Sequence, residues 1–590
     1  MQNAAALDAP RPAVRRRAGL KRLARASRPT PAQLGLAALS ALLLVLSFPD
    51  FDLWPLAWVG LVPLMLAVAR DPARGPQAFV LGWLTGTLYF YGSCWWLTHS
   101  MIHYGGIPRP VAYLLLAPVT VVVGLFPAAW ATLLARAARR WGAKSLLLAP
   151  FAWAALEWAR LAVTGQLWNA LGYSQAYQPA LIQTASWGGV YAVSFLIVTT
   201  NAAAAFCLLR GGSPLSLAAP ALTLCLVALT IWAGARASHP SGSDQLRADG
   251  DAAAAAVVIA VQPNVSPSFE RTAEENDALV ARHLSTSAEA LRAWDDAQAA
   301  RPDGGGPLPA ADGATTGDES AATGDGSAAA GGGSAAMKRV PRLVVWPESP
   351  MNFRWANDSR FRETVAGFAR AHGASVLFNS LEPAPAGGAY NSAVLVGERG
   401  ELVAQYDKIR LLPFGEYVPL PWWLGGALVG AIVGDFTPGA DYKLLPVGSA
   451  RAGVFICFES AFPSLSREFA GAGADVLINI SNDGYLGRTP VLRQHLANAV
   501  FRAVENSRPV LRVTNTGITA RISPRGEVSD ATESFQPAAR TWTITRGPGG
   551  KSFYTRRGDL FVALCALITA LLFVGSQLSV VRGQLPAAQD

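Results

Sequence analysis

The stretch Gly453-Val-Phe-Ile-Cys-Phe-Glu-Ser460 decides how the rest of the chain is interpreted. Val454 to Ile456 have the apolar, β-rich character of a buried strand, and Cys457 follows where that strand stops. Cys457 alone among the cysteines lies in a water-soluble stretch; the others lie in long apolar segments, at Cys94, Cys207, Cys225 and Cys565. A lone Cys is most often a small buried hydrophobe. At a strand end, with acid and base groups supplied from elsewhere in the chain, it can instead be a nucleophile.

The composition indicates a membrane part and a soluble part in one chain. A length of 590 residues predicts more than one domain, and 18 Trp with a positive mean hydropathy are typical of membrane proteins. The net charge is +9, and eight basic residues lie between Arg11 and Arg28. Because this arm, residues 1–30, directly precedes an apolar segment, it is interpreted as a cytoplasmic topology signal rather than as a nucleic-acid-binding tail.

Apolar segments of bilayer length, ~20 residues, follow the arm and predict an α-helical membrane domain. Seven spans are expected within residues 31–240, and an eighth within residues 558–581. The expected spans are Leu34–Phe48, Leu53–Ala69, Ala78–Leu97, Val111–Leu134, Ser145–Ala159, Leu181–Leu209, Leu215–Ala235 and Leu560–Gly575.

The distribution of basic residues predicts the orientation of these spans. With the arm in the cytoplasm, the loops on that side carry Arg70, Arg74, Arg136, Arg139, Arg140, Lys144 and Arg210. The opposite loops carry only Arg109 and Arg160, which is the positive-inside asymmetry. Arg556 and Arg557 disagree with it, but seven crossings still place the soluble region outside the cytoplasm.

Residues 254–546 show the alternation of strands and helices that is typical of a layered α/β domain. The expected strands are Val257–Val261, Leu343–Trp346, Ser375–Phe378, Ala393–Val396, Val454–Ile456, Val476–Ile480, Val510–Val513 and Trp542–Thr545. Helical patterns lie between several of them, at Asp277–Trp294, Phe361–His372 and Leu492–Asn506. Residues 296–336 hold almost no large apolar side chain, so they are expected to form a disordered insertion.

Three polar side chains come out of apolar surroundings in this region. Glu348 follows the strand that ends in Trp346-Pro347, Lys408 lies in Tyr406-Asp-Lys-Ile-Arg410, and Cys457 is the third. A carboxylate can take the thiol proton, and an ammonium favours the thiolate and an oxyanion. Taken singly, Glu348 and Lys408 fit a surface salt bridge better; taken with Cys457, they fit a catalytic set.

The ordered motifs around these residues resemble the membrane-embedded apolipoprotein N-acyltransferases of the nitrilase superfamily. The resemblance is carried by Trp346-Pro-Glu348, Asp407-Lys-Ile-Arg-Leu-Leu-Pro-Phe-Gly-Glu-Tyr-Val-Pro419, Ile456-Cys-Phe-Glu459, Ser481-Asn-Asp483 and Thr514-Asn-Thr-Gly-Ile-Thr519. It covers nearly the whole chain except the arm and the insertion. It implies a Glu-Lys-Cys triad in an α-β-β-α sandwich, over residues 254–546, attached to about eight membrane spans.

What the resemblance implies is acyl transfer at the outer, periplasmic face of the bacterial inner membrane. Cys457 would take an acyl chain from a phospholipid as a thioester and pass it to the α-amine of a diacylglyceryl apolipoprotein. Glu348 would be the general base and Lys408 the oxyanion-side cation. Glu416 would orient that ammonium or share in proton transfer, and Glu459 would hold the geometry. Glu416 and Glu459 could also be ordinary polar neighbours. No metal or nucleotide cofactor is implied.

Several aromatic residues are candidate lipid contacts. Trp422 and Trp423 lie in a segment, 419–439, that has almost no charge, so it is either a lid toward the bilayer or a loop packed on its own domain. Trp168 could line the lipid site or belong to an interfacial aromatic belt. The sequence departs from the family pattern at Phe458, where Tyr is frequent, and at Gly484-Tyr-Leu-Gly487, where Tyr485 keeps an aromatic ring.

Two other functions remain open from the sequence. A membrane-tethered nitrilase-type amidase would use the same triad but release the acyl group to water. A transporter or scaffold would need no triad; the expected spans hold few charged residues, Glu157 being the main one, which argues against a solute path.

Overall fold

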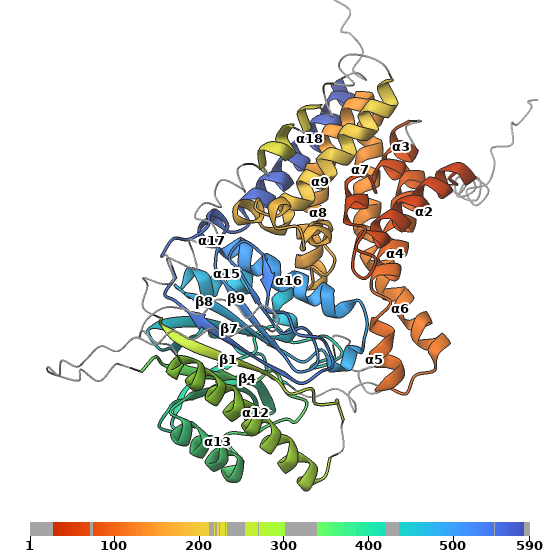
Figure 1. Cartoon of the computed structure of the whole chain (residues 1–590). Helices are drawn as coiled ribbons and strands as arrows, with labels where there is room; N and C mark the ends of the chain where they lie inside the picture. The colour runs from red at the N-terminus through yellow and green to blue at the C-terminus, as the bar shows by residue number, and fades with distance from the viewer. Residues whose placement is uncertain are drawn as a thin grey trace, which may run out of the picture.

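The computed structural model describes residues 28–70, 75–211, 218, 221–223, 225–230, 232, 254–268, 271–300, 339–385, 387–418, 436–547 and 549–582. A group of helices forms one half of the molecule and two stacked sheets with flanking helices form the other (Figure 1). Nearly all of the expected basic arm, about half of the seventh expected span and nearly all of the expected insertion lie outside the described residues.

The helical half contains long helices and short 3₁₀ turns. Its elements are α2 (Pro31–Leu46), η1 (Trp54–Trp58), α3 (Val62–Ala69), α4 (Gly75–Ser93), α5 (Leu97–His103), α6 (Arg109–Val123), α7 (Leu125–Trp141), η2 (Gly142–Leu148), α8 (Ala149–Thr164), η3 (Leu171–Gln175), η4 (Pro179–Leu181), α9 (Ala185–Arg210), α17 (Phe553–Arg557) and α18 (Leu560–Arg582). Among the described residues, two helical stretches are long and apolar enough to cross a membrane, Arg109–Thr164 and Ala185–Arg210. Shorter apolar helices include Pro31–Leu46, Trp54–Ala69 and Leu560–Gly575.

Several of the expected spans are interrupted in the structure, and the fourth and the second are examples. The segment expected as one span from Val111 to Leu134 is divided between α6 and α7 at Gly124. Pro127 explains the break, because it has no backbone N–H to donate to the preceding turn. The second expected span begins as the 3₁₀ turn η1 before α3 starts, and both elements have Pro in their first turn.

The other half is built on two six-stranded sheets. The first has the order β12-β1-β2-β3-β4-β5 and the second β11-β10-β9-β8-β7-β6. The strands are β1 (Ala256–Gln262), β2 (Arg342–Val345), β3 (Ser375–Pro383), β4 (Ala389–Val396), β5 (Leu402–Asp407), β6 (Leu444–Val447), β7 (Ala450–Ile456), β8 (Val476–Ser481), β9 (Val510–Thr514), β10 (Ala520–Ile522), β11 (Val528–Ser529) and β12 (Ala538–Ile544). β1, β2 and β3 run parallel, as do β7, β8 and β9.

Helices cover both outer faces of the stacked sheets, so the layers run α-β-β-α as expected (Figure 1). α12 (Ala273–Ala299) and α13 (Ser359–His372) cover the first sheet, and α15 (Pro463–Gly471) and α16 (Val491–Asn506) cover the second. Alternate residues of β1 face opposite ways: Val258 packs between the sheets, and Ile259 packs with α13. α12 continues to Ala299, so the first residues of the expected insertion 296–336 are helical.

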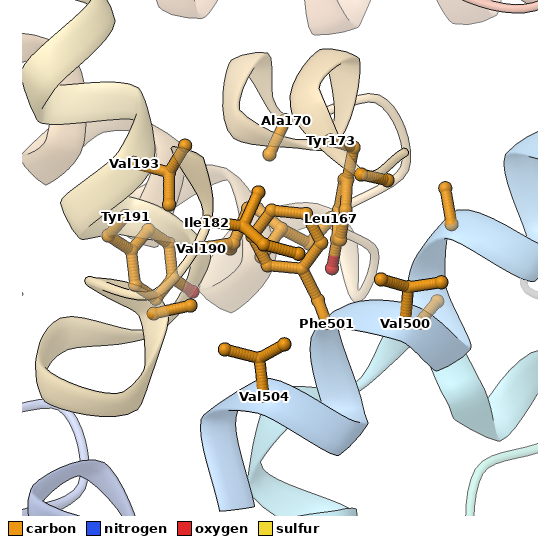
Figure 2. Close-up of a cluster of buried hydrophobic side chains, with 14 of the residues drawn as sticks. Leu167, Ala170, Tyr173, Ile182, Val190, Tyr191, Val193, Val500, Phe501 and Val504 are labelled. Atoms are coloured by element: carbon orange, nitrogen blue, oxygen red, sulfur yellow. The ribbon is translucent and has the colours of Figure 1, made fainter. Parts of the chain in front are cut away.

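α16 joins the two halves, because every residue from Val491 to Asn506 except Arg493 is buried. Figure 2 shows Phe501 and Val504 of α16 among side chains of the helical half, including Tyr173, Ile182 and Val190. The rings of Tyr173 and Phe501 meet edge to face, with centroids 5.0 Å apart. The sandwich is therefore docked on the helices through an apolar seam along this helix.

Candidate active site

The three residues singled out by the sequence lie together at one end of the sandwich. Glu348 follows β2, Lys408 directly follows β5, and Cys457 directly follows β7. β2 and β5 belong to the first sheet and β7 to the second, so the group forms where the sheets face each other. Lys408 Nζ is 3.4 Å from Glu348 Oε1, and both charges are close enough to act on the pKa of the Cys457 thiol.

Lys408 is buried between two carboxylates. Its Nζ donates to Glu416 Oε1 at 2.9 Å and its side chain is 1% exposed. The Asn391 amide donates to Glu416 Oε1 at 2.6 Å and to Glu348 Oε1 at 3.0 Å, so it links the two acids. Burial alone would lower the pKa of Lys408, but Glu416 and Glu348 outweigh it and raise that pKa above its usual value. The ammonium is therefore charged at neutral pH.

Cys457 occupies a sharp turn between β7 and the 3₁₀ helix η6 (Cys457–Ala461). Its φ of 51° lies in the left-handed region, which is uncommon for a residue other than glycine. Burial and the negative charge of Glu348 raise the pKa of the thiol above its usual value, while Lys408 acts in the opposite direction. The thiol is thus protonated at neutral pH and needs a base to become a nucleophile.

Glu348 is held as an acceptor beside this thiol. Its Oε2 accepts a hydrogen bond from the backbone N–H of Asn482 at 3.1 Å, while its Oε1 accepts from Asn391. Its side chain remains 13% exposed, so it is not sealed from a substrate. A fixed carboxylate with room beside it has the properties of a general base.

Glu459 lies under the site and joins two strand ends. It is 1% exposed. Its oxygens accept from the backbone N–H groups of Ile409, Arg410 and Ile456 and from the hydroxyl of Tyr406, at 2.8–3.0 Å. Burial raises the pKa of Glu459 to about 7, although the backbone donors oppose this shift. These contacts fix the segment after Lys408 against the turn at Cys457.

A second buried network reaches Cys457 through its backbone carbonyl. Asp483 follows β8, and its two oxygens lie 2.8 Å from His495 Nδ1 and 2.7 Å from Arg512 Nη2. The other ring nitrogen of His495 lies 3.0 Å from the Cys457 carbonyl oxygen. Burial would raise the pKa of Asp483, but Arg512 and His495 outweigh it and hold that pKa well below its usual range. Asp483 is therefore an anion.

The candidate aromatic contacts differ in position. Trp168 stacks on Phe458, the residue after Cys457, with centroids 6.3 Å apart and planes 15° apart. Tyr485 instead packs edge-on against Tyr104 of the helical half, at 5.1 Å. Of the expected contacts, Trp168 therefore lies beside the nucleophilic turn. Trp422 and Trp423 lie outside the described residues.

The sequence reasoning missed Asn391 and His495 as members of the site. Asn391 is a buried amide in strand β4, and His495 lies in α16, where every residue except Arg493 is buried. A buried polar residue in such a segment is the signal that could have found both, because it needs hydrogen-bond partners. Within the described part of the chain, no group of three or more His, Cys, Asp or Glu side chains is arranged to hold a metal ion.

Comparison with known families agrees with both halves of this architecture. Residues 40–203 match the family described as the apolipoprotein N-acyltransferase N-terminal domain, and residues 257–543 match the carbon-nitrogen hydrolase family. An amidase of the nitrilase superfamily from Nesterenkonia covers 53% of this chain and 98% of its own at 15% identity, with a TM-score of 0.32. A likeness of that size adds nothing to the argument.

Similar proteins match over most of their length. An apolipoprotein N-acyltransferase of Geobacter metallireducens is 34% identical over 91% of this chain and 95% of its own length. One of Sinorhizobium medicae is 30% identical over 83% of this chain and 85% of its own length. With both domains matched in order and at this coverage, the chain belongs to the apolipoprotein N-acyltransferase family.

Proposed function

We propose that this enzyme moves an acyl chain from a phospholipid to the α-amine of a diacylglyceryl apolipoprotein through a thioester on Cys457. One observation carries the assignment of roles: Lys408 lies between Glu348 and Glu416, and both Lys408 and Glu348 act on the pKa of the same thiol. A protonated thiol, a fixed carboxylate and a charged ammonium are the parts that nucleophilic acyl transfer needs.

In the first half-reaction Glu348 takes the thiol proton as Cys457 Sγ attacks the ester carbonyl of the phospholipid. The Lys408 ammonium stabilises the negative charge that develops on the carbonyl oxygen. The ester C–O bond then breaks, and Glu348 returns its proton to the departing lysophospholipid oxygen. The products are the acyl-thioester and a lysophospholipid.

In the second half-reaction the α-amine of the apolipoprotein attacks the thioester carbonyl. Glu348 accepts a proton from the amine, an amide bond forms, and the C–S bond breaks. The proton passes to the sulfur and regenerates the thiol. Glu416 keeps Lys408 aligned through both steps, because Glu416 Oε1 accepts from Nζ while its Oε2 accepts from the backbone N–H of Leu412 at 2.7 Å.

We place the enzyme in the bacterial inner membrane with about eight spans and the sandwich on the periplasmic face. The positive-inside asymmetry of the loops supports this orientation, and the apolar helices support insertion. The check is labelling of Arg399→Cys, a site whose side chain is 88% exposed on the sandwich. A membrane-impermeant maleimide should label this variant in intact spheroplasts, above the background of the unsubstituted enzyme. Labelling that requires lysis would contradict the orientation.

Trapping the intermediate tests the assigned chemistry. The purified enzyme, incubated with phospholipid in detergent micelles, should gain the mass of one acyl chain on Cys457, and Cys457→Ala should neither gain it nor transfer. Adding a diacylglyceryl peptide should discharge the thioester and yield N-acyl peptide. Transfer by Cys457→Ala would overturn the proposal, and free fatty acid without N-acyl peptide would instead indicate the amidase.

A further inference from the structure

Two consecutive residues of α16, Gln494 and His495, contact different halves of the molecule. Gln494 is 3% exposed, and its side-chain hydrogen bonds all go to the helical half. Its oxygen accepts from the indole N–H groups of Trp96 and Trp168, at 3.0 and 2.9 Å, and its nitrogen donates to the carbonyls of Pro49 and Ser93, at 3.2 and 3.0 Å. These bonds use the whole hydrogen-bonding capacity of an amide. Gln494 therefore ties α16 to three separate segments of the helical half.

His495 contacts the nucleophilic turn instead. Its Nδ1 faces Asp483 Oδ1 at 2.8 Å and its Nε2 faces the carbonyl oxygen of Cys457 at 3.0 Å. Both partners can only accept, since one is an ionised carboxylate and the other a carbonyl, so each ring nitrogen faces an acceptor. Arg512 holds the far side of Asp483 and so fixes the acid that orients the ring.

His495 holds the backbone carbonyl of Cys457. The backbone conformation at Cys457 sets the direction in which the thiol points. Cys457 has a φ of 51°, and a residue in that region keeps its conformation only where its surroundings hold it. A hydrogen bond to the Cys457 carbonyl fixes the peptide plane next to this torsion. The base is held from the same loop, because the backbone N–H of Asn482, next to Asp483, donates to Glu348 Oε2.

We propose that His495 is a positioning residue that holds the turn at Cys457, and that Gln494 couples this turn to the docking of the helical half. The proposal rests on the proposed function, in which Cys457 is the nucleophile. Trp168 adds to the coupling, because its indole donates to Gln494 while its ring lies 5.5 Å from His495 and stacks on Phe458.

Two substitutions at His495 separate the bond to Cys457 from the bond to Asp483. In His495→Gln the amide nitrogen can reach the place of Nε2 and keep the bond to the carbonyl. In His495→Asn the shorter amide reaches only the place of Nδ1 and keeps the bond to Asp483. A merely structural histidine would be replaced at least as well by Asn as by Gln.

The measurement is the steady-state rate of acyl transfer from phospholipid to a diacylglyceryl peptide in micelles, with kcat and KM separated and the thermal midpoint recorded. We expect His495→Asn to lose about 10²-fold in kcat, the size of loss that a misplaced reacting group causes, with KM within about twofold. His495→Gln should stay within about tenfold of the unsubstituted enzyme. Equal losses in the two variants, or losses that follow the thermal midpoint alone, would overturn the role of His495.

The coupling through Gln494 has a matched control in Gln183. Gln183 also bridges the halves, because its amide donates to the carbonyl of Arg525 at 2.9 Å, but it does not touch the turn at Cys457. Gln494→Met should lower kcat for acyl transfer by about tenfold, the direction of a misplaced nucleophile, whereas Gln183→Met should leave kcat unchanged. Equal effects of the two would show that docking in general matters, and would overturn coupling through α16.

The activity of Cys457→Ala distinguishes a failure of the positioning role from a failure of the proposed function. If Cys457→Ala still forms product, the proposed function fails, whatever His495 does. If Cys457→Ala is inactive and His495→Asn keeps the kcat of the unsubstituted enzyme, only the positioning role fails.

Discussion

At the scale of single residues, Lys408 and Glu348 act on the Cys457 thiol in opposite directions. Burial and Glu348 raise the pKa of the thiol, and Lys408 lowers it. Because the thiolate is the reactive form, alkylation by iodoacetamide should be slow at pH 7 and accelerate as pH rises toward that raised pKa. Lys408→Met removes the lowering charge, so alkylation at pH 8 should slow by about tenfold for each unit of further rise.

The control for this change is Lys443→Met. The Lys443 side chain is 51% exposed and pairs with Asp441 at 3.7 Å. Losing it should leave the alkylation rate of Cys457 as it was. Alkylation followed by mass spectrometry across pH 6–9 gives both profiles. A Lys408→Met profile that matches the control would contradict the electrostatic role of the ammonium.

At the scale of elements, a glycine pair forms a kink in α9 where this helix contacts α16. Gly188 and Gly189 leave the helical conformation, and Gly189 has a φ of 65°. The helix restarts at Val190, whose backbone N–H donates to Glu505 Oε1 of α16 at 3.0 Å. A Cβ on Gly189 would lie 2.9 Å from Tyr554 Cε2. The kink therefore depends on a residue without a side chain.

Gly189→Ala should destabilise the enzyme. A side chain at the Gly189 torsions, φ 65° and ψ −168°, which essentially only glycine adopts, costs ~1–3 kcal/mol, and the contact with Tyr554 adds to this cost. Gly35→Ala in α2 is the matched control, because nothing lies within 4 Å of its Cβ position, and it should be neutral or stabilising. The thermal midpoint in detergent should fall for Gly189→Ala alone. Equal midpoints for the two variants would show that the kink tolerates a side chain.

The predictability of these elements from sequence depended on burial. Interior strands such as β7 and β8 were predicted because buried parallel strands are apolar throughout. β5 was missed because Leu402 and Val403 are exposed on an edge strand and polar residues follow them, so the apolar pattern is weak. The break at Gly124 was missed because apolar length alone does not show where a helix bends.

The predictability of the site had a different limit. Glu348 and Cys457 could be proposed because each residue type has a known chemistry and follows an apolar run, and Lys408 could be proposed from its place in Tyr406-Asp-Lys-Ile-Arg410. Asn391 and His495 could not, because their importance comes from contacts with residues far away in the sequence: Asn391 with Glu348, 43 positions earlier, and His495 with Cys457, 38 positions earlier.

At the scale of the whole molecule, one buried ion pair lies on the seam between the halves. Arg502 Nη2 donates to Glu505 Oε1 at 2.9 Å, and both side chains are fully buried. The same guanidinium donates to the Tyr173 hydroxyl at 3.2 Å, so the pair contacts the helical half as well as α16. Removing Arg502 would leave the Glu505 carboxylate as an uncompensated buried charge, which typically costs ~3–5 kcal/mol. The docking of the halves should therefore depend on the charge state of Glu505.

Burial raises the pKa of Glu505 to about 7, against the opposing effect of Arg502, while its usual value is 4.5. The folded enzyme therefore holds this proton where the unfolded chain has released it, so the contribution of Glu505 to stability is full below pH 4.5 and is lost as pH rises through 7. The thermal midpoint should decrease as pH rises from 5.5 to 8. The decrease should be smaller in Glu505→Gln. The pKa of Glu459 is raised in the same direction, so Glu459 should account for the rest of the decrease. Glu398→Gln, on the exposed surface, should leave the slope intact. A midpoint that rises over this range, or an unchanged slope in Glu505→Gln, would show that the seam does not respond to this proton.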